Sequence, residues 1–263
     1  TLKSVKNQTY LPIEIIVIDS NSKDNTKKIA KKYGCKIINY SGKLLGARYV
    51  GVKKSKGSYI LLLDSDQILI ADAIERAVQG MNKNDMLIFE EFTYQPKTWI
   101  QKLFEADRRL VHQVKDLDPY TSVLLPRFYK KNILKKAFKN IPKKVLPKVA
   151  GQDHAIIYFE AYKISKKVDI LSNAVYHIEP ATFKELIKKN YRWGKTSKDL
   201  VKIGYYKQLL ERKVRFRKVV LGSNNLSNFL KSALLLIMKG IPYKIGYFTG
   251  VFEKNDWKTY FIQ

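Results

Sequence analysis

The chain has 263 residues, of which 45% are hydrophobic and 28% charged, proportions typical of a folded globular protein and not of a disordered one. Its 50 basic and 23 acidic residues give a formal net charge of +27, which indicates an anionic partner such as nucleic acid, an acidic membrane surface or a phosphorylated substrate. The single cysteine, Cys35, excludes a framework of intrachain disulfides and is consistent with a reducing cytosol. No signal peptide is visible, and the uncharged apolar runs are too short to span a bilayer.

Helices and strands alternate along the first part of the chain. Residues 1–8 look like the end of an amphipathic helix, and two apolar strands, 11–19 and 59–63, each lead into an aspartate, Asp19 and Asp64. The other elements expected here are helix 26–33, strand 36–40 and helix 43–54. This is the spacing of βαβ units, so we predict an α/β fold with a doubly wound, mainly parallel sheet flanked by helices. Both aspartates then lie on the same rim of that sheet.

Charge is distributed unevenly over the rest of the chain. Residues 126–150 hold nine basic residues and no acidic one, and we expect an anion-facing loop or a solvated face there, not a core segment. The further expected elements are helix 71–81, strand 85–89, helix 96–114, a helix from 151, strand 167–178 and a helix that opens with the capping box Thr182-Phe-Lys-Glu185. Residues 181–263 carry 18 basic and 5 acidic residues and include two apolar blocks, 229–238 and 245–252. We therefore predict a catalytic domain, 1–180, and a basic, amphipathic helical extension, 181–263, which either lies in a membrane interface or packs back on the catalytic domain.

The stretch Ser58–Asp66 is the strongest candidate site. Its apolar run is typical of a fully buried strand, and ligands of open α/β sheets bind at the carboxyl ends of the strands. Asp64 and Asp66 point the same way on an extended backbone, so together they could hold one divalent cation beside a diphosphate. The alternative is that Asp64 caps the next helix and Asp66 is a solvated loop residue.

Together, these motifs resemble family two of the inverting glycosyltransferases, which have the GT-A fold. The similarity extends over about residues 1–195, and its order and spacing are more specific than any single motif. The segments that carry it are 2–10, 13–26, Gly46-Ala-Arg48-Tyr-Val-Gly51, 57–66, Pro126-Arg-Phe-Tyr-Lys130, Gly151-Gln-Asp153 and Val175-Tyr-His177.

The chain departs from the family pattern in several places. The family begins with a strand that contributes to the nucleotide pocket, whereas this chain opens in the following helix, so we expect that first strand to be missing. Ser20 replaces the second residue of a frequent Asp-Asp pair, and Gln152 replaces the usual acidic neighbour of Asp153. Arg192-Trp193 is similar to the Gln-x-x-Arg-Trp signature of processive members, but Lys189 stands where Gln would, so processive synthesis is not supported.

The resemblance implies a metal-dependent, hexosyltransferase-type enzyme whose donor is a nucleoside-diphosphate sugar. Asp66 is implied to bind Mg²⁺ or Mn²⁺, which would neutralise the charge that develops on the departing diphosphate. Asp153 is implied to be the general base that deprotonates the acceptor, with inversion at the anomeric carbon. The other implied roles are Asp64 accepting from a ribose hydroxyl or metal-bound water, Asp19 contacting the base, Arg48 pairing with the diphosphate or with Asp64, and His177 completing the metal shell or touching the diphosphate.

Some of these residues have structural alternatives. Arg48 could be an ordinary surface arginine, and His177 a structural histidine at a strand end. Glu90-Glu91 also ends an expected strand and supplies rival bases. We expect His112 and His154 to be surface or packing residues.

The acceptor is expected to be a glycan or a polyprenyl-linked lipid, with the protein peripheral on the cytoplasmic face of the cell membrane, because basic segments and an apolar tail suit an anionic surface. A nucleic-acid-binding protein is the second hypothesis, motivated by charge and by aromatics among lysines. No recognition motif supports it, and an acidic rim without a metal would repel phosphates. A nucleotidyltransferase is the third, and it would need a Gly-rich basic loop after a first strand, a region that this sequence does not include.

Overall fold

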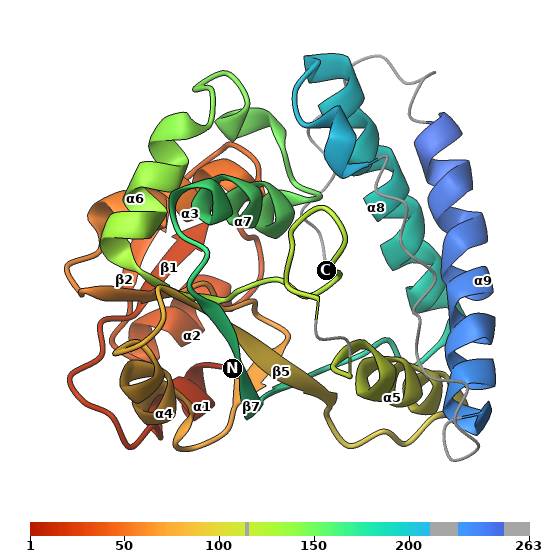
Figure 1. The fold of residues 1–263 in the computed structure, drawn as a ribbon, viewed down its shortest axis with the longest axis horizontal. Coiled ribbons are helices and arrows are strands. Elements are labelled where there is room, and N and C mark those ends of the chain that lie inside the picture. Colours follow the sequence, from red (N-terminus) through yellow and green to blue (C-terminus); the bar gives the residue numbers. More distant parts are fainter. Residues whose placement is uncertain (114–115, 211–225, 250–263) are drawn as a thin grey trace.

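The structure is a computed structural model that describes residues 1–113, 116–210 and 226–249 (Figure 1). The helices are α1 (Leu2–Lys6), α2 (Thr26–Lys32), α3 (Leu44–Lys54), α4 (Ala73–Gly80), α5 (Trp99–Val111), α6 (Lys131–Asn140), α7 (Asp153–Ile164), α8 (Phe183–Ile203) and α9 (Leu226–Thr249). The strands are β1 (Ile16–Asp19), β2 (Lys36–Asn39), β3 (Tyr59–Leu61), β4 (Gln67–Leu69), β5 (Met86–Thr93), β6 (Phe128–Lys130) and β7 (Val168–His177). The predicted α/β class, with helices flanking the sheet, is confirmed.

The sheet is mixed, so the expectation of a mainly parallel sheet is wrong. In the five-stranded sheet, of order β3-β6-β5-β7-β4, only β5 and β7 run parallel, and the other neighbours pair antiparallel. β1 and β2 pair parallel in a separate two-stranded sheet. The error arises from β4 and β6, because three-residue strands that run against their neighbours leave no trace in the helix-strand spacing.

The basic segment 126–150 is part of the core, not a loop. It forms β6 and α6, and the apolar residues of α6 recur at helical spacing, which turns them inward while the lysines between them face outward. The buried side chains of the segment are Phe128, Tyr129, Ile133, Leu134, Ala137, Phe138, Ile141, Val145, Leu146 and Val149. The absence of acidic residues therefore marks one solvated face of a packed helix.

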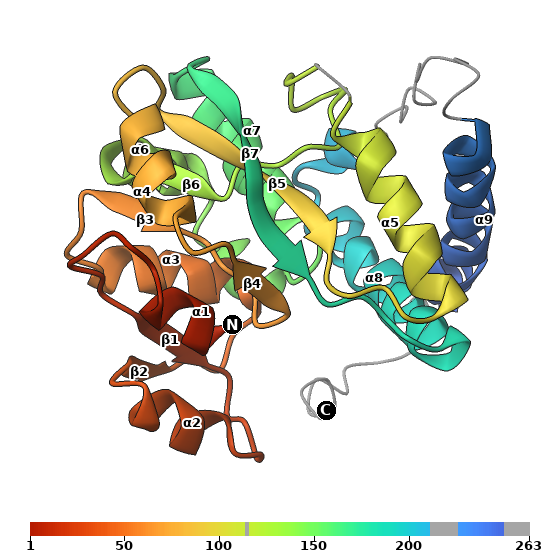
Figure 2. The same cartoon turned by 90° about the horizontal axis from the view of Figure 1, so that it is seen from below.

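The predicted helical C-terminal region is confirmed, and α8, α9 and α5 lie side by side next to the sheet (Figures 1 and 2). The predicted capping box opens α8: the Thr182 hydroxyl accepts from Glu185 N, and the Glu185 carboxylate accepts from Thr182 N. Two glycines let α8 and α9 touch backbone to backbone, since a Cβ on Gly194 would lie 1.9 Å from Tyr243 O and one on Gly246 would lie 2.0 Å from Tyr191 O. The apolar blocks expected at 229–238 and 245–252 belong to the single helix α9 up to Thr249, and the remainder lies outside the described residues. Within the described residues, every helix is too short or too polar to cross a membrane. The domain boundary at residue 180 stays a prediction.

Candidate active site

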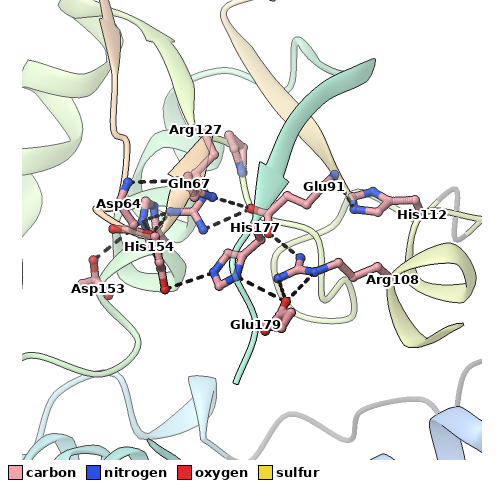
Figure 3. Close-up of polar contacts among 12 residues, drawn as sticks. Asp64, Gln67, Glu91, Arg108, His112, Arg127, Asp153, His154, His177 and Glu179 are labelled. Carbon is pink, nitrogen blue, oxygen red and sulfur yellow. Dashed lines mark hydrogen bonds and ion pairs between the residues drawn. The ribbon is translucent and has the colours of Figure 1, made fainter. Parts of the chain in front are cut away.

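The candidate residues lie along one groove beside the strand ends. Asp19 ends β1, Asp64 and Asp66 follow β3, and Asp153 is the first residue of α7. His177 ends β7 and lines the same groove. Figure 3 shows the polar contacts around Asp64, Asp153 and His177. The structure thus brings the predicted base and the predicted metal-binding residues to one opening.

Asp64 is held by two arginines. Its Oδ1 accepts from Arg48 Nη2 and its Oδ2 from Arg127 Nη1, both at 2.6 Å. Arg48 is 8% exposed and also donates its Nε proton to Asp153 Oδ2, so it is a buried bridge between two carboxylates and not a surface residue. Burial opposes ionisation of Asp64, but the two guanidinium groups outweigh it and hold the pKa of this carboxyl well below its ordinary value.

His154 belongs to the site, contrary to expectation. Its Nε2 lies 3.7 Å from Asp64 Oδ2 and 4.0 Å from Asp153 Oδ2, and it contacts Arg127. Burial, together with the positive charges of Arg127 and Arg48, lowers the pKa of His154 to about 4. The imidazole is therefore neutral at physiological pH and adds no third positive charge around Asp64.

Glu91 connects the arginine and glutamine beside Asp64 to Arg108. It lies within β5, which continues to Thr93, so the rival base expected at a strand end is a half-buried ion-pair residue. Its carboxylate contacts Arg108 and lies 3.2 Å from Arg127 Nη2, and it accepts from Gln67 Nε2 at 2.9 Å. Burial raises the pKa of Glu91, but Arg127 and Arg108 outweigh this and lower it to about 2. Such a carboxylate is too acidic to accept an acceptor proton at neutral pH.

Asp66 is the open carboxylate of the pair. The antiparallel register of β4 and β7 pairs Gln67 with His177, and Ile178 N donates to Asp66 O at 2.8 Å, which fixes Asp66 beside the end of β7. His177 Nε2 lies 3.4 Å from Asp66 Oδ2, and Lys189 Nζ lies 3.7 Å from the same oxygen. The Asp66 side chain is 41% exposed, whereas that of Asp64 is 29% exposed and arginine-bound.

A divalent cation fits Asp66 and His177 better than it fits Asp64. His177 Nδ1 lies 3.3 Å from Glu179 Oε1, and a proton on Nδ1 would leave the Nε2 lone pair facing Asp66. Two ligands of this kind leave positions for phosphate oxygens and water. Both oxygens of Asp64 already accept from arginines. Among the described residues, no cluster of three or more metal-binding side chains is found.

Asp19 lines the groove, but its carboxylate has protein partners of its own. Its carboxylate accepts from Ser22 N at 3.2 Å and lies 3.2 Å from Lys27 Nζ, and its side chain is fully covered. Burial opposes ionisation, but the contacts with Ser22 and Lys27 lower the pKa of Asp19 below its ordinary value. The contact of Asp19 with a nucleotide base stays a prediction.

Several residues of the site were not predicted from the sequence. Arg127 directly follows Pro126 in the basic segment, and it could have been suspected because a buried carboxylate such as Asp64 requires a cation. Arg108 bonds Glu179 across 71 sequence positions, and Gln67, 0% exposed, connects Asp64 N to Glu91. Such long-range pairs have no local signal. His112 is a packing residue as expected, and its Nε2 accepts from Glu91 N at 3.0 Å.

The family model described as "Glycosyl transferase family 2" matches residues 1–140, more than half of the chain. The chain belongs to glycosyl transferase family 2. The suspected resemblance is confirmed, and this assignment favours glycosyl transfer over the nucleic-acid-binding and nucleotidyltransferase hypotheses.

Several glycosyltransferases are similar to the chain over part of their length. An uncharacterized glycosyltransferase of Rickettsia prowazekii is 37% identical over 87 residues, 32% of this chain and 27% of the relative. A second, from Rickettsia conorii, is 29% identical over 209 residues, 77% of this chain and 65% of the relative. The UDP-Glc:alpha-D-GlcNAc-diphosphoundecaprenol beta-1,3-glucosyltransferase WfgD of Escherichia coli is 34% identical over 91 residues, 33% of this chain and 36% of WfgD. The chain spans less than two thirds of each of these relatives.

Solved structures confirm the GT-A fold of this family 2 chain. Residues 1–349 of TarS from S. aureus match with a TM-score of 0.53 and 17% identity, over 95% of this chain and 84% of TarS 1–349. The same TarS fragment in complex with UDP-GlcNAc matches with a TM-score of 0.53 and 16% identity, over 95% and 85%. At this identity the similarity concerns the fold alone.

Proposed function

We propose that the protein is a metal-dependent, inverting glycosyltransferase that moves a hexosyl group from a nucleoside-diphosphate sugar to an acceptor hydroxyl or phosphate. The observation that carries this proposal is the division of one groove into an arginine-held carboxylate, Asp153, and an open carboxylate, Asp66. The first can take a proton from an acceptor, and the second can serve the diphosphate. Inversion needs the two functions on opposite sides of the sugar.

Asp153 is the proposed general base. Its Oδ2 accepts from Arg48 Nε, whereas Oδ1 has no hydrogen-bond partner among the described residues. Oδ1 is therefore available for the acceptor hydroxyl. The contact with Arg48 fixes the direction of the carboxylate, which is a requirement for a positioned base. Gln152, in the left-handed region at φ 64°, starts the turn that places Asp153 at the head of α7.

Asp66 and His177 are the proposed ligands of Mg²⁺ or Mn²⁺, and Glu179 orients His177. When bound, the cation would offset the negative charge that develops on the leaving diphosphate. Lys189 lies beside Asp66 and supplies a fixed positive charge for the same diphosphate. Asp64 is proposed to accept from a donor hydroxyl or a metal-bound water, and Asp19 to contact the nucleotide base.

The donor and acceptor classes are proposed from chemistry and from the relatives. WfgD is named for a UDP-glucose donor and a diphosphoundecaprenol-linked acceptor, and TarS was solved with UDP-GlcNAc. Basic side chains also line this groove, where they could meet an acceptor diphosphate: Lys144, Lys148, Arg192, Lys195 and Lys202. We accordingly propose a UDP-sugar donor, a glycan or polyprenyl-linked acceptor, and a peripheral location on the cytoplasmic face of the cell membrane.

The test is transfer from UDP-glucose and UDP-GlcNAc to a short-chain polyprenyl diphosphate-linked sugar, with Mn²⁺ titrated against EDTA. We expect metal-dependent transfer, a product of inverted anomeric configuration by proton NMR, and loss of transfer in Asp66→Asn. Asp169→Asn, an exposed carboxylate of β7 outside the groove, is the matched control and should keep full activity. Full transfer in EDTA, or a retained anomeric configuration, would contradict the mechanism.

A further inference from the structure

Helix α9 presents apolar side chains to solvent. The large ones that are at least 41% exposed are Leu226, Leu230, Leu234, Leu236, Ile237, Ile241, Ile245 and Phe248. Except for Leu236, they recur at intervals of three or four residues and so form a continuous stripe along one side of the helix. We call these seven residues the α9 stripe.

The opposite side of α9 is already packed. Ser232, Leu235, Pro242 and Gly246 are buried, and the Ser232 hydroxyl donates to Asp107 Oδ1 of α5. The contacts at Gly194 and Gly246 fix the rotation of α9 against α8. The α9 stripe therefore cannot turn inward without breaking this packing. A water-facing helix side of this length is normally polar, so the stripe marks a surface with a partner.

Charge favours a membrane over a second copy of the chain as that partner. Exposed Lys231 and Lys244 flank or interrupt the stripe, and residues 181–263 hold 18 basic against 5 acidic residues. Two stripes packed together would bring two chains of net charge +27 into contact, which electrostatic repulsion opposes. An anionic bilayer surface attracts the same lysines and takes up the apolar side chains.

We propose that the α9 stripe lies in the headgroup region of an anionic membrane, with α9 parallel to the surface. This inference rests on the proposed function, since it gives the surface on which a lipid-linked acceptor would be met. α8 packs along α9 (Figure 1), and its residues Lys189 and Trp193 line the groove. The α9 surface therefore holds the α8 wall of the groove near the lipid headgroups.

The experiment is co-sedimentation of the full chain with phosphatidylglycerol–phosphatidylcholine vesicles, without donor or acceptor. We expect binding that falls at high salt and in pure phosphatidylcholine vesicles. Ile237→Gln/Ile241→Gln should reduce the partition coefficient at least about tenfold, because two exposed apolar side chains no longer enter the bilayer. Leu11→Gln/Ile29→Gln, which also removes two exposed apolar side chains, is the matched control and should bind as the wild type does.

Circular dichroism and a light-scattering mass without lipid complete the test. The stripe positions are exposed, so both variants should keep wild-type helicity. A wild type that ignores anionic vesicles, equal losses in both double variants, or a lipid-free dimer that Ile237→Gln/Ile241→Gln converts to monomer would each overturn the proposal. Vesicle binding needs neither donor nor metal, so a failure of glycosyl transfer with intact vesicle binding counts against the proposed function alone.

Discussion

Asp64 and Asp66 are separated by one residue, yet they lie in opposite environments. Asp64 accepts from Arg48 and Arg127 on the arginine-bound side of the groove, whereas Asp66 is 41% exposed and faces His177 and Lys189 on the open side. Gln67 and Glu91 connect the two sides. The comparison shows that the two carboxylates of an Asp-x-Asp motif can have different roles. One forms ion pairs within the protein, and the other stays accessible to a ligand.

The arginine-bound side should lose most activity when its proposed base is neutralised. Asp153→Asn keeps the shape but cannot take a proton, so we expect kcat for transfer to fall about 10²–10⁴-fold with little change in donor KM. Steady-state kinetics with a saturating acceptor measure this. Asn132→Asp, on α6 outside the groove, is the control, since it exchanges the same two side chains in the reverse direction. A loss of kcat below tenfold in Asp153→Asn would mean that another residue is the general base.

Removing the charge that joins the two sides should cost stability. Glu91→Gln leaves Arg108 and Arg127 without one of their carboxylates, and breaking a buried ion pair in this way costs about 3–5 kcal/mol. Urea unfolding measures the change. Glu90→Gln is the matched neighbour and should cost far less, because among the described residues Glu90 accepts only from Asn173 N, in an exposed hydrogen bond. Equal losses in the free energy of unfolding for the two variants would mean that the Glu91 ion pairs do not stabilise the connection between the two sides.

On the open side, Mn²⁺ binding should depend on Glu179, the residue proposed to orient His177. Glu179→Gln removes the carboxylate near Nδ1, and we expect the apparent affinity for Mn²⁺ in the transfer assay to fall about 10–100-fold. Glu179 also pairs with Arg108. Arg108→Lys serves as the comparison because it weakens that pair and leaves His177 with its carboxylate. An unchanged Mn²⁺ requirement in Glu179→Gln would remove His177 from the metal site.

The smallest expected effect is a pH dependence from His154. Its pKa is lowered to about 4 in the folded protein, so between pH 6.5 and 4 the unfolded chain binds the extra proton. Stability from this group is present above pH 6.5 and is lost as the pH falls through about 4. At pH 5.5 the loss should be about 1 kcal/mol relative to pH 7.5. Urea unfolding of His154→Gln at both pH values should show a smaller loss than the wild type, and an identical loss would contradict the assignment.

Local patterns predicted the elements, and long-range contacts determined the site. The strand ending at Asp19, the aspartates that follow β3 and the Thr182 capping box were readable because each is a short-range pattern of polarity. The packing of 126–150 was also readable in the helical spacing of Ile133 and Phe138, but the lysine content obscured it. Arg108, Glu179 and the division between Asp64 and Asp66 depend on contacts between residues far apart in sequence, which one chain without alignment does not reveal.

The central claim is that Asp66 and His177 hold a divalent cation for the donor diphosphate. Titration calorimetry of UDP into the full chain tests it most directly, with Mn²⁺ or with EDTA. We expect UDP to bind at least about tenfold more tightly with Mn²⁺, and the Asp66→Asn variant to lose this gain while keeping the EDTA affinity, since each tenfold corresponds to about 1.4 kcal/mol of lost metal-phosphate interaction. Equal UDP affinity with and without Mn²⁺ in the wild type, or an undiminished Mn²⁺ effect in Asp66→Asn, would contradict the claim.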